Sequence, residues 1–169
     1  MYKKIISFSF VVLLLIILDQ ITKAIAVTTL SDINCIILIK DFLSFELVYN
    51  YGAAFGILNG SRILFIIITV VVCLFIELFY IRIPDIKRYT PLKISCIGIF
   101  AGAIGNFIDR VKQGYVVDFI ACDFGTYSFP RFNMADIYIT VTAFLLIFLL
   151  IFYYKDNEIT SIFRKEDSK

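Results

Sequence analysis

The stretch IISFSFVVLLLIIL, residues 5–18, decides the fold class of this chain. It contains no charged residue, and the apolar character continues past Asp19 to about Val27. A helix needs about 20 apolar residues to cross the hydrocarbon core of a bilayer. Because backbone groups cannot stay unpaired in lipid, the stretch predicts a membrane-spanning helix over residues 5–27.

Three further apolar blocks follow, at residues 63–83, 92–108 and 135–154. Of the 169 residues, 60% are hydrophobic and 18% charged, whereas about a quarter of a soluble domain is charged. The third block is rich in glycine, including Gly102, which suits close helix–helix packing. We therefore expect an all-α membrane protein with four transmembrane helices and one domain over residues 1–169.

The first block allows one alternative, a cleaved signal peptide, because Lys3 and Lys4 precede a short apolar core. However, no small-x-small cleavage site follows Leu18, and Asp19 and Lys23 continue at helical spacing. A retained helix is the favoured interpretation.

Lysines and arginines indicate the orientation, since cytoplasmic loops carry an excess of them. Ten of the 16 fall on one side of the predicted helices. They are Lys3, Lys4, Arg82, Lys87, Arg88, Lys93, Lys155, Arg164, Lys165 and Lys169. Both termini and the loop 84–91 are therefore expected in the cytoplasm, with the segments 28–62 and 109–134 outside.

The two outer segments differ in pattern. Residues 36–50, IILIKDFLSFELVYN, mix β-branched and aromatic residues with partial alternation, which predicts a small β-sheet element on the outer surface. Residues 109–134 contain Gly114, Gly125 and Pro130 among aromatics, which predicts an outer loop or short helix.

Composition narrows the chemistry. The chain has no histidine, which excludes Ser-His and Cys-His pairs and histidine-ligated zinc. The four cysteines lack CxxC spacing, so we expect no metal site, while a disulfide between Cys35 and Cys122 stays open. The net charge of +2 gives no indication of nucleic-acid binding. Hydrolytic chemistry is left to carboxylates, a Ser-Lys pair or a threonine.

Charged residues within apolar blocks are expected to have a structural or functional role, since a charge at mid-bilayer costs about 2.5–3.5 kcal/mol on insertion scales. Lys23 follows Asp19 at helical spacing, so the two form either a structural ion pair or a brace for a site between helices. Glu77, in the second block, has no such partner in sequence and is expected to reach toward the cytoplasmic interface.

Two segments bring aspartates to the same outer level. GAIGNFIDRVKQGYVVDFI, residues 102–120, places Asn106, Asp109 and Arg110 within one turn and Asp118 after a bend. FPRFNMADI, residues 129–137, places Asn133 and Asp136 in the first turn of the fourth helix. Either aspartate alone is typical of a helix cap or a solvated charge. Because both regions emerge on one side, Asp118 and Asp136 are predicted to meet.

Such a pair suits peptide hydrolysis. Two carboxylates about 4 Å apart repel by about 4 kcal/mol at an effective dielectric near 20, so they share one proton near neutral pH. The ionised member then takes a proton from water and the protonated member donates one. In YNYGAAFG, residues 49–56, Asn50 offers a polar amide and Gly52 allows close backbone approach, although a glycine-rich turn explains this motif equally well.

Four motifs together resemble the lipoprotein signal peptidases, the signal peptidase II family of bacteria. They are DQITK at 19–23, VYNYGAAFG at 48–56, GAIGNFIDRVKQGYVVDFI at 102–120 and FPRFNMADIYI at 129–139. The resemblance implies an aspartyl endopeptidase of the bacterial plasma membrane, with its site near the outer face and no metal or cofactor. Nothing in the sequence requires a partner subunit, so we expect a monomer. Its substrate would be a diacylglyceryl-modified prolipoprotein, cut just before the lipidated cysteine, and globomycin-type compounds would inhibit it.

The resemblance also implies residue roles. Asp118 and Asp136 would be catalytic. The supporting or substrate-binding residues would be Asp19, Lys23, Asn50, Gly52, Gly102, Asn106, Asp109, Arg110 and Asn133. Thr142 departs from the family pattern, where glycine is expected in many members, and should alter packing rather than chemistry.

Two rival functions remain. A small transporter or channel subunit would need polar residues through the depth of several helices, whereas here they gather at the outer ends. A Ser-Lys protease would pair Lys23 with Ser7 or Ser9, which lie three or more turns away on the same helix. Both are disfavoured by these positions.

Overall fold

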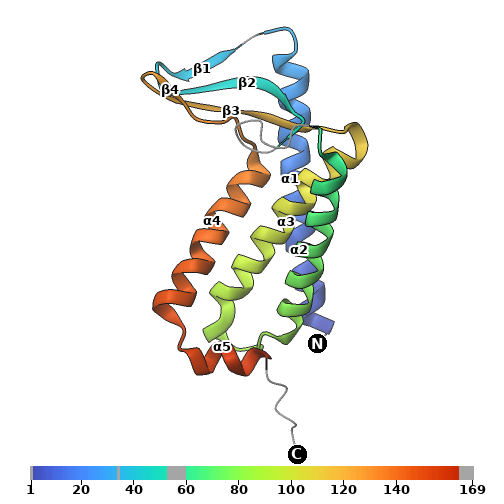
Figure 1. Cartoon of the computed structure of the whole chain (residues 1–169), viewed down its shortest axis with the longest axis vertical. Helices are drawn as coiled ribbons and strands as arrows, with labels where there is room; N and C mark the ends of the chain where they lie inside the picture. Colours follow the sequence, from blue (N-terminus) through green and yellow to red (C-terminus); the bar gives the residue numbers. More distant parts are fainter. Residues whose placement is uncertain (1, 34, 53–59, 164–169) are drawn as a thin grey trace, which may run out of the picture.

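The computed structural model describes residues 2–33, 35–52 and 60–163, and it shows a bundle of long helices with a small sheet at one end (Figure 1). The helices are α1 (Tyr2–Leu30), α2 (Arg62–Arg82), α3 (Thr90–Gln113), α4 (Met134–Phe148) and α5 (Asp156–Phe163). A 3₁₀ turn, η2 (Lys87–Tyr89), precedes α3, and a π-helical turn, η3 (Leu149–Tyr153), extends α4. Residues 53–56 of the YNYGAAFG motif and Arg164, Lys165 and Lys169 lie outside the described residues.

Four helices are long and apolar enough to cross a membrane, which confirms the expected fold class. They are α1, α2, the segment Lys87–Gln113 and the segment Met134–Tyr153. Helix α3 runs past the expected end at 108, because Asp109 and Arg110 have polar partners in the Lys23 ammonium and the backbone oxygen of Gly52. Its end is closed by Gly114, which adopts the left-handed conformation with φ of 86°.

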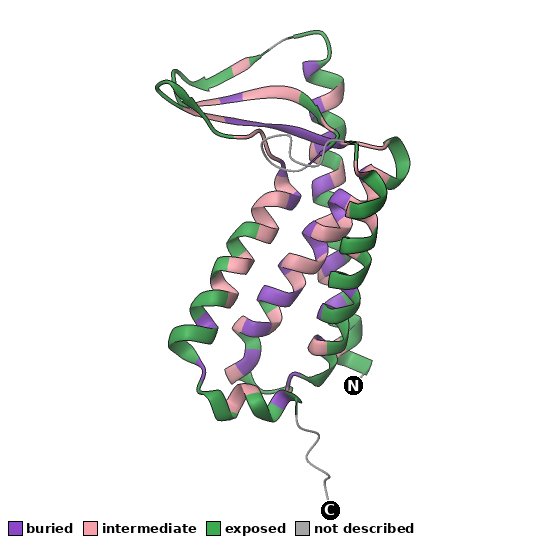
Figure 2. Cartoon of the chain, in the orientation of Figure 1, coloured by how far each residue is buried: buried purple, intermediate pink, exposed green. Residues whose placement is uncertain are grey.

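Burial in this bundle is the reverse of that in a soluble protein. Most large apolar side chains of α1, α2 and α4 are exposed, and buried positions gather on α3 and on the inward faces around it (Figure 2). Exposed apolar faces on helices of this length are what a lipid environment requires.

Glycines set the contact between α3 and α4. A Cβ on Gly102 would meet the backbone oxygen of Ala135 and the side chain of Ile139, and a Cβ on Gly98 would meet the side chain of Thr142. The expected departure at Thr142 is therefore a packing feature, since its methyl and hydroxyl groups fill the space above Gly98.

The sheet has four antiparallel strands in the order β1-β2-β3-β4. They are β1 (Ile36–Ile39), β2 (Leu43–Asn50), β3 (Val116–Phe124) and β4 (Tyr127–Ser128). Strands β2 and β3 form the main ladder, in which Val48 lies opposite Asp118 and Asn50 opposite Val116. The sheet element expected at 36–50 is confirmed.

The loop or short helix expected at 109–134 is wrong over residues 116–124, which form strand β3. Its first six residues are buried, because one side faces α1 and the start of α4 while β2 covers its edge. Residues on both faces of this strand are apolar apart from Asp118 and Asp123, so it lacks the alternation by which a strand is normally recognised. The four cysteines are free thiols, so the disulfide left open between Cys35 and Cys122 does not form.

The opposite end of the bundle is closed by α5. The Arg88 guanidinium donates to both carboxylate oxygens of Glu158, at 2.9 and 3.1 Å, and to the backbone oxygen of Tyr153. This pairing lowers the pKa of Glu158 to about 2. Ile162 is buried under the bundle, so α5 ties the end of α4 to the segment before α3.

Replacing Gly102 by alanine should destabilise the bundle. The new Cβ meets the backbone of Ala135, which moves only if α4 moves, and overpacking of this kind costs about 1–3 kcal/mol. The measurement is the melting temperature in detergent. A Cβ at position 98 meets only the Thr142 side chain. Adding Thr142→Ala should therefore restore the stability of Gly98→Ala but not that of Gly102→Ala. An unchanged melting temperature for Gly102→Ala would contradict this packing.

Candidate active site

A pocket of about 530 Å³ lies between the sheet and the sheet ends of α3 and α4. Both predicted aspartates line it, as do four of the predicted supporting residues. The pocket is lined by Asn50, Gly52, Asn106, Arg110, Val116, Asp118, Phe129, Pro130, Arg131, Phe132, Asp136, Ile137, Thr140 and Val141. The structure therefore brings together residues from β2, α3, β3 and α4.

Asp118 comes from strand β3 and is 2% exposed. One carboxylate oxygen accepts from the Asn133 amide at 2.7 Å, and the other accepts from the Asn50 amide at 2.9 Å. The Asn50 oxygen accepts from the backbone N–H of Gly52 at 2.9 Å, which turns the amide nitrogen toward Asp118. Asp118 is thus held by two neutral donors.

Asp136 lies in the first turn of α4 and takes part in a capping box with Asn133. The Asn133 side chain accepts from the Asp136 backbone N–H at 3.0 Å, and the Asp136 carboxylate accepts from the Asn133 backbone N–H at 3.1 Å. The other Asp136 oxygen accepts from the Asn106 amide at 2.7 Å. The local helix cap therefore also fixes the carboxylate.

Asn133 joins the two aspartates. Its amide nitrogen donates to Asp118 and also lies within hydrogen-bond reach of the Asn106 oxygen, at 3.2 Å. Because Asn133 is fully buried and also caps α4, both carboxylates belong to one hydrogen-bond network. The two aspartates predicted to meet do so through this residue.

The environment favours a proton on this pair. Burial raises the pKa of Asp118 to about 7, and the nearby charge of Asp136 acts in the same direction. The hydrogen bonds from Asn50 and Asn133 act against this rise because they stabilise the ionised form. Burial and the neighbouring carboxylate outweigh these hydrogen bonds, so the pKa of Asp118 lies near neutral pH.

A buried ion cluster of Lys23, Asp19 and Asp109 contacts the pocket residue Asn106. The Lys23 ammonium lies 2.9 Å from Asp19 and 2.9 Å from Asp109, and it donates to the Asn106 oxygen at 2.9 Å. All three charged side chains are at most 5% exposed. Of the two interpretations of the Asp19–Lys23 pair, the structure supports the brace, since the pair connects α1 to α3.

The carboxylates of this cluster also hold the backbone around the pocket. Asp19 accepts from the N–H of Ala135 at 2.9 Å, and Asp109 accepts from the N–H of Val117 at 3.3 Å. These bonds fix the residues that precede Asp136 and Asp118. With its ammonium engaged three times, Lys23 is not placed to activate Ser7 or Ser9.

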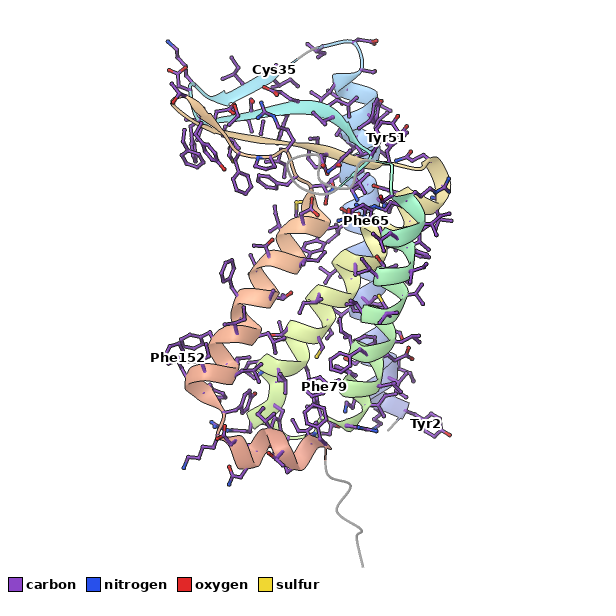
Figure 3. All side chains as sticks on the ribbon, viewed as in Figure 1. Tyr2, Cys35, Tyr51, Phe65, Phe79 and Phe152 are labelled. Carbon is purple, nitrogen blue, oxygen red and sulfur yellow. The ribbon has the colours of Figure 1, made fainter. Side chains whose placement is uncertain are left out.

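Arg110 projects into the pocket from α3. It donates to the backbone oxygen of Gly52 at 3.1 Å, and its guanidinium lies 4.6 Å from the centre of the Phe65 ring. Phe65 lies at the sheet end of α2 (Figure 3), so Arg110 connects α3 to α2 and to the end of β2. Gly102 and Asp109, in contrast, do not line the pocket and act through packing and the ion cluster.

One supporting residue was missed by the sequence analysis. The Gln20 amide donates to Asp109 at 3.0 Å and to the backbone oxygen of Gly105 at 3.3 Å. The sequence does contain an indication of this role, because Gln20 is a polar residue beside Asp19 within an apolar block. Its partners on α3 are distant in sequence and gave no local pattern.

Comparison with known proteins decides the family. The family model described as signal peptidase (SPase) II matches residues 11–152. The chain belongs to the signal peptidase II family. The lipoprotein signal peptidase of Clostridium tetani is 44% identical over 156 residues, covering 89% of this chain and 97% of that protein. The one from Staphylococcus haemolyticus is 40% identical over 141 residues, covering 83% and 88%.

Solved structures agree with the family assignment. A bacterial membrane enzyme solved at 2.3 Å resolution superposes with a TM-score of 0.75 at 35% identity, covering 96% of this chain and 94% of that one. Membership of the signal peptidase II family makes the chain a multi-pass membrane peptidase. Among the described residues, no group of three or more cysteines, aspartates and glutamates is placed to hold a metal ion.

The ion cluster gives a stability prediction. Lys23→Met leaves two buried carboxylates without their cation, and breaking a buried pair in this way costs about 3–5 kcal/mol. The melting temperature in detergent should fall strongly. Lys93→Met is the matched control, because Lys93 pairs with Asp85, which is 76% exposed, and its loss should leave the melting temperature unchanged. Equal melting temperatures for Lys23→Met and the wild type would show that the cluster does not hold the helices.

Proposed function

We propose that this protein is an intramembrane aspartyl endopeptidase that cleaves the signal peptide from diacylglyceryl-modified prolipoproteins, just before the lipidated cysteine. The observation that carries the proposal is the convergence of Asp118 and Asp136 on one pocket, joined through Asn133. Family membership supports the same reaction class.

The reaction needs one proton shared by the two aspartates. The ionised carboxylate takes a proton from a water molecule, which attacks the carbonyl carbon of the scissile bond. The protonated carboxyl donates its proton to the carbonyl oxygen, which gives a tetrahedral diol. The carboxyl that took the water proton then passes it to the leaving nitrogen as the carbon–nitrogen bond breaks, and the other carboxylate takes a proton back from the diol, so the pair again holds one proton. The proton belongs to the pair, so the two steps are described by the titration of the dyad rather than of either residue.

The amides around the dyad keep the two carboxylates in place during these transfers. Asn50 and Asn133 hold Asp118, and Asn106 and the Asn133 backbone hold Asp136. Amide donors stabilise a carboxylate without supplying a positive charge that would remove the shared proton. Arg110, at the edge of the pocket, is placed to bind polar groups of the substrate backbone.

The pocket suits a lipidated peptide at a membrane surface. Its bilayer side is formed by α4, where Ile137 and Val141 offer apolar surface for acyl chains and for the signal segment. Phe129 and Phe132 form its wall on the sheet side. Membrane lipid surrounds the exposed helix faces, and globomycin-type cyclic peptides would bind in the pocket against the dyad.

We place the protein in the bacterial plasma membrane as a monomer. The excess of lysine and arginine at the end opposite the sheet supports cytoplasmic termini and a site near the outer face. In this orientation the polar site residues gather at one end of the bundle, which disfavours a channel or transporter. Glu77 lies on the exposed side of α2, in a separate groove between α1 and α2.

Asp118→Asn and Asp136→Asn should each insert and fold but lose at least about 100-fold in turnover, because each removes one acid–base partner. The measurement is cleavage of a diacylglyceryl-modified prolipoprotein by purified protein. Asp123→Asn is the matched control, since Asp123 lies on the same strand and does not itself line the pocket. Activity within about tenfold of the wild type in either dyad variant would contradict the assignment.

The pH dependence should reflect the shared proton. Burial raises the pKa of Asp118 to about 7, so the pair loses its last proton as the pH rises through this region. We therefore expect kcat/KM, which reports the free enzyme, to fall on the alkaline side with an apparent pKa near 7. The sign follows because the raised pKa makes the protonated form persist below neutral pH and vanish above it. A value of kcat/KM that is flat up to strongly alkaline pH would contradict a dyad that needs one proton.

A further inference from the structure

Thr140 is a polar residue in the apolar part of the pocket, next to Ile137 and Val141 in its lining. It lies on α4 one turn after Asp136, so the two side chains share a face of the helix. It lines the same pocket as the dyad, between Ile137 and Val141. At about 1.5 Å per residue, Thr140 lies about 6 Å from Asp136 along α4, away from the sheet and toward the bilayer.

The Thr140 hydroxyl differs from those of Thr142, Thr69 and Ser95, which are hydrogen-bonded to their own helices. Thr142, on the same helix, donates to the backbone oxygen of Tyr138, and Thr69 and Ser95 donate in the same way on α2 and α3. Within the described part of the chain, no such bond is recorded for Thr140, and its side chain is exposed. A hydroxyl facing an apolar pocket at membrane depth gains free energy from a partner supplied by the ligand.

The proposed substrate carries such a partner at this depth. A diacylglyceryl group is attached to the cysteine sulfur, and its two ester carbonyls lie a few bonds away, between the scissile bond and the acyl chains. When the scissile bond lies at the dyad and the chains extend into the bilayer along α4, these carbonyls lie on the bilayer side of Asp136. An ester carbonyl oxygen only accepts hydrogen bonds, and a threonine hydroxyl is able to donate one.

We propose that Thr140 is a substrate-binding residue whose hydroxyl donates a hydrogen bond to an ester carbonyl of the diacylglyceryl group. This proposal rests on the proposed function, since it names a contact to the same substrate. It assigns the residue a role in affinity and in selection of the ester-linked lipid, and none in proton transfer.

The test compares Thr140→Val with the wild type on two substrates. The first is the diacylglyceryl-modified prolipoprotein, and the second carries the same chains in ether linkage and lacks the carbonyls. Valine keeps the shape of threonine and removes only the hydroxyl. Thr142→Val is the matched control, because Thr142 lies on the same helix outside this pocket. Thr140→Ser retains the hydroxyl and removes the methyl group.

We expect Thr140→Val to raise KM about three- to tenfold for the ester substrate, with kcat and its pH profile unchanged. For the ether substrate, KM should be equal in Thr140→Val and the wild type. Thr140→Ser and Thr142→Val should behave like the wild type on both. Where turnover of the ether substrate is too slow to measure, its inhibition constant against the ester substrate replaces KM.

Three results would overturn the proposal. An unchanged KM for Thr140→Val on the ester substrate would show that the hydroxyl makes no contact. An equal rise on both substrates would indicate packing, and an equal effect in Thr142→Val would indicate a general change in α4. Failure of the wild type to cleave the ester substrate would refute the proposed function instead, so the two failures are distinguishable.

Discussion

Helices in a bilayer gain little by burying apolar side chains against each other, because lipid tails are as apolar as leucine. Their arrangement must therefore come from close packing and from polar contacts. In this protein the Lys23 ammonium makes such a contact, held between Asp19 and Asp109 with almost no exposure. It joins α1 to α3 at the sheet end. Gly102 and Gly98 bring α4 against α3 along the length below it.

The same cluster orients the groups that hold the dyad. The Asn106 oxygen accepts from Lys23, so its amide nitrogen faces Asp136. Asn50 and Asn133 follow the same rule, since the oxygen of each accepts from a backbone N–H and the nitrogen of each donates to Asp118. An asparagine amide is symmetric in shape, and a fixed donor on one side decides which end faces a carboxylate. The three amides thus become directed donors to the two aspartates.

The sequence allows prediction of those features that depend on composition and chain direction. Apolar blocks locate the four helices, and the asymmetry of lysines and arginines predicts that the segments containing Asp118 and Asp136 lie at the same end of the bundle. The sequence does not predict β3, because this strand is buried against α1 and α4 and its residues do not alternate between apolar and polar. It leaves the Asp19–Lys23 pair ambiguous, since the deciding partner, Asp109, lies on another helix. The orientation of Asn106 depends on that same distant contact and has no local signal.

The charges around the site bear on the shared proton that the proposed mechanism needs. Four carboxylates, those of Asp19, Asp109, Asp118 and Asp136, lie near two cations, Lys23 and Arg110. Lys23 is committed to the brace, and Arg110 makes its recorded hydrogen bond to Gly52 rather than to either aspartate. Asp118 and Asp136 accept their side-chain hydrogen bonds from neutral amides, so burial and the repulsion between the two carboxylates favour retention of one proton. Lys23 is the smallest of the influences on the pKa of Asp118, so the brace that assembles the helices leaves burial to favour the shared proton that the proposed hydrolysis needs.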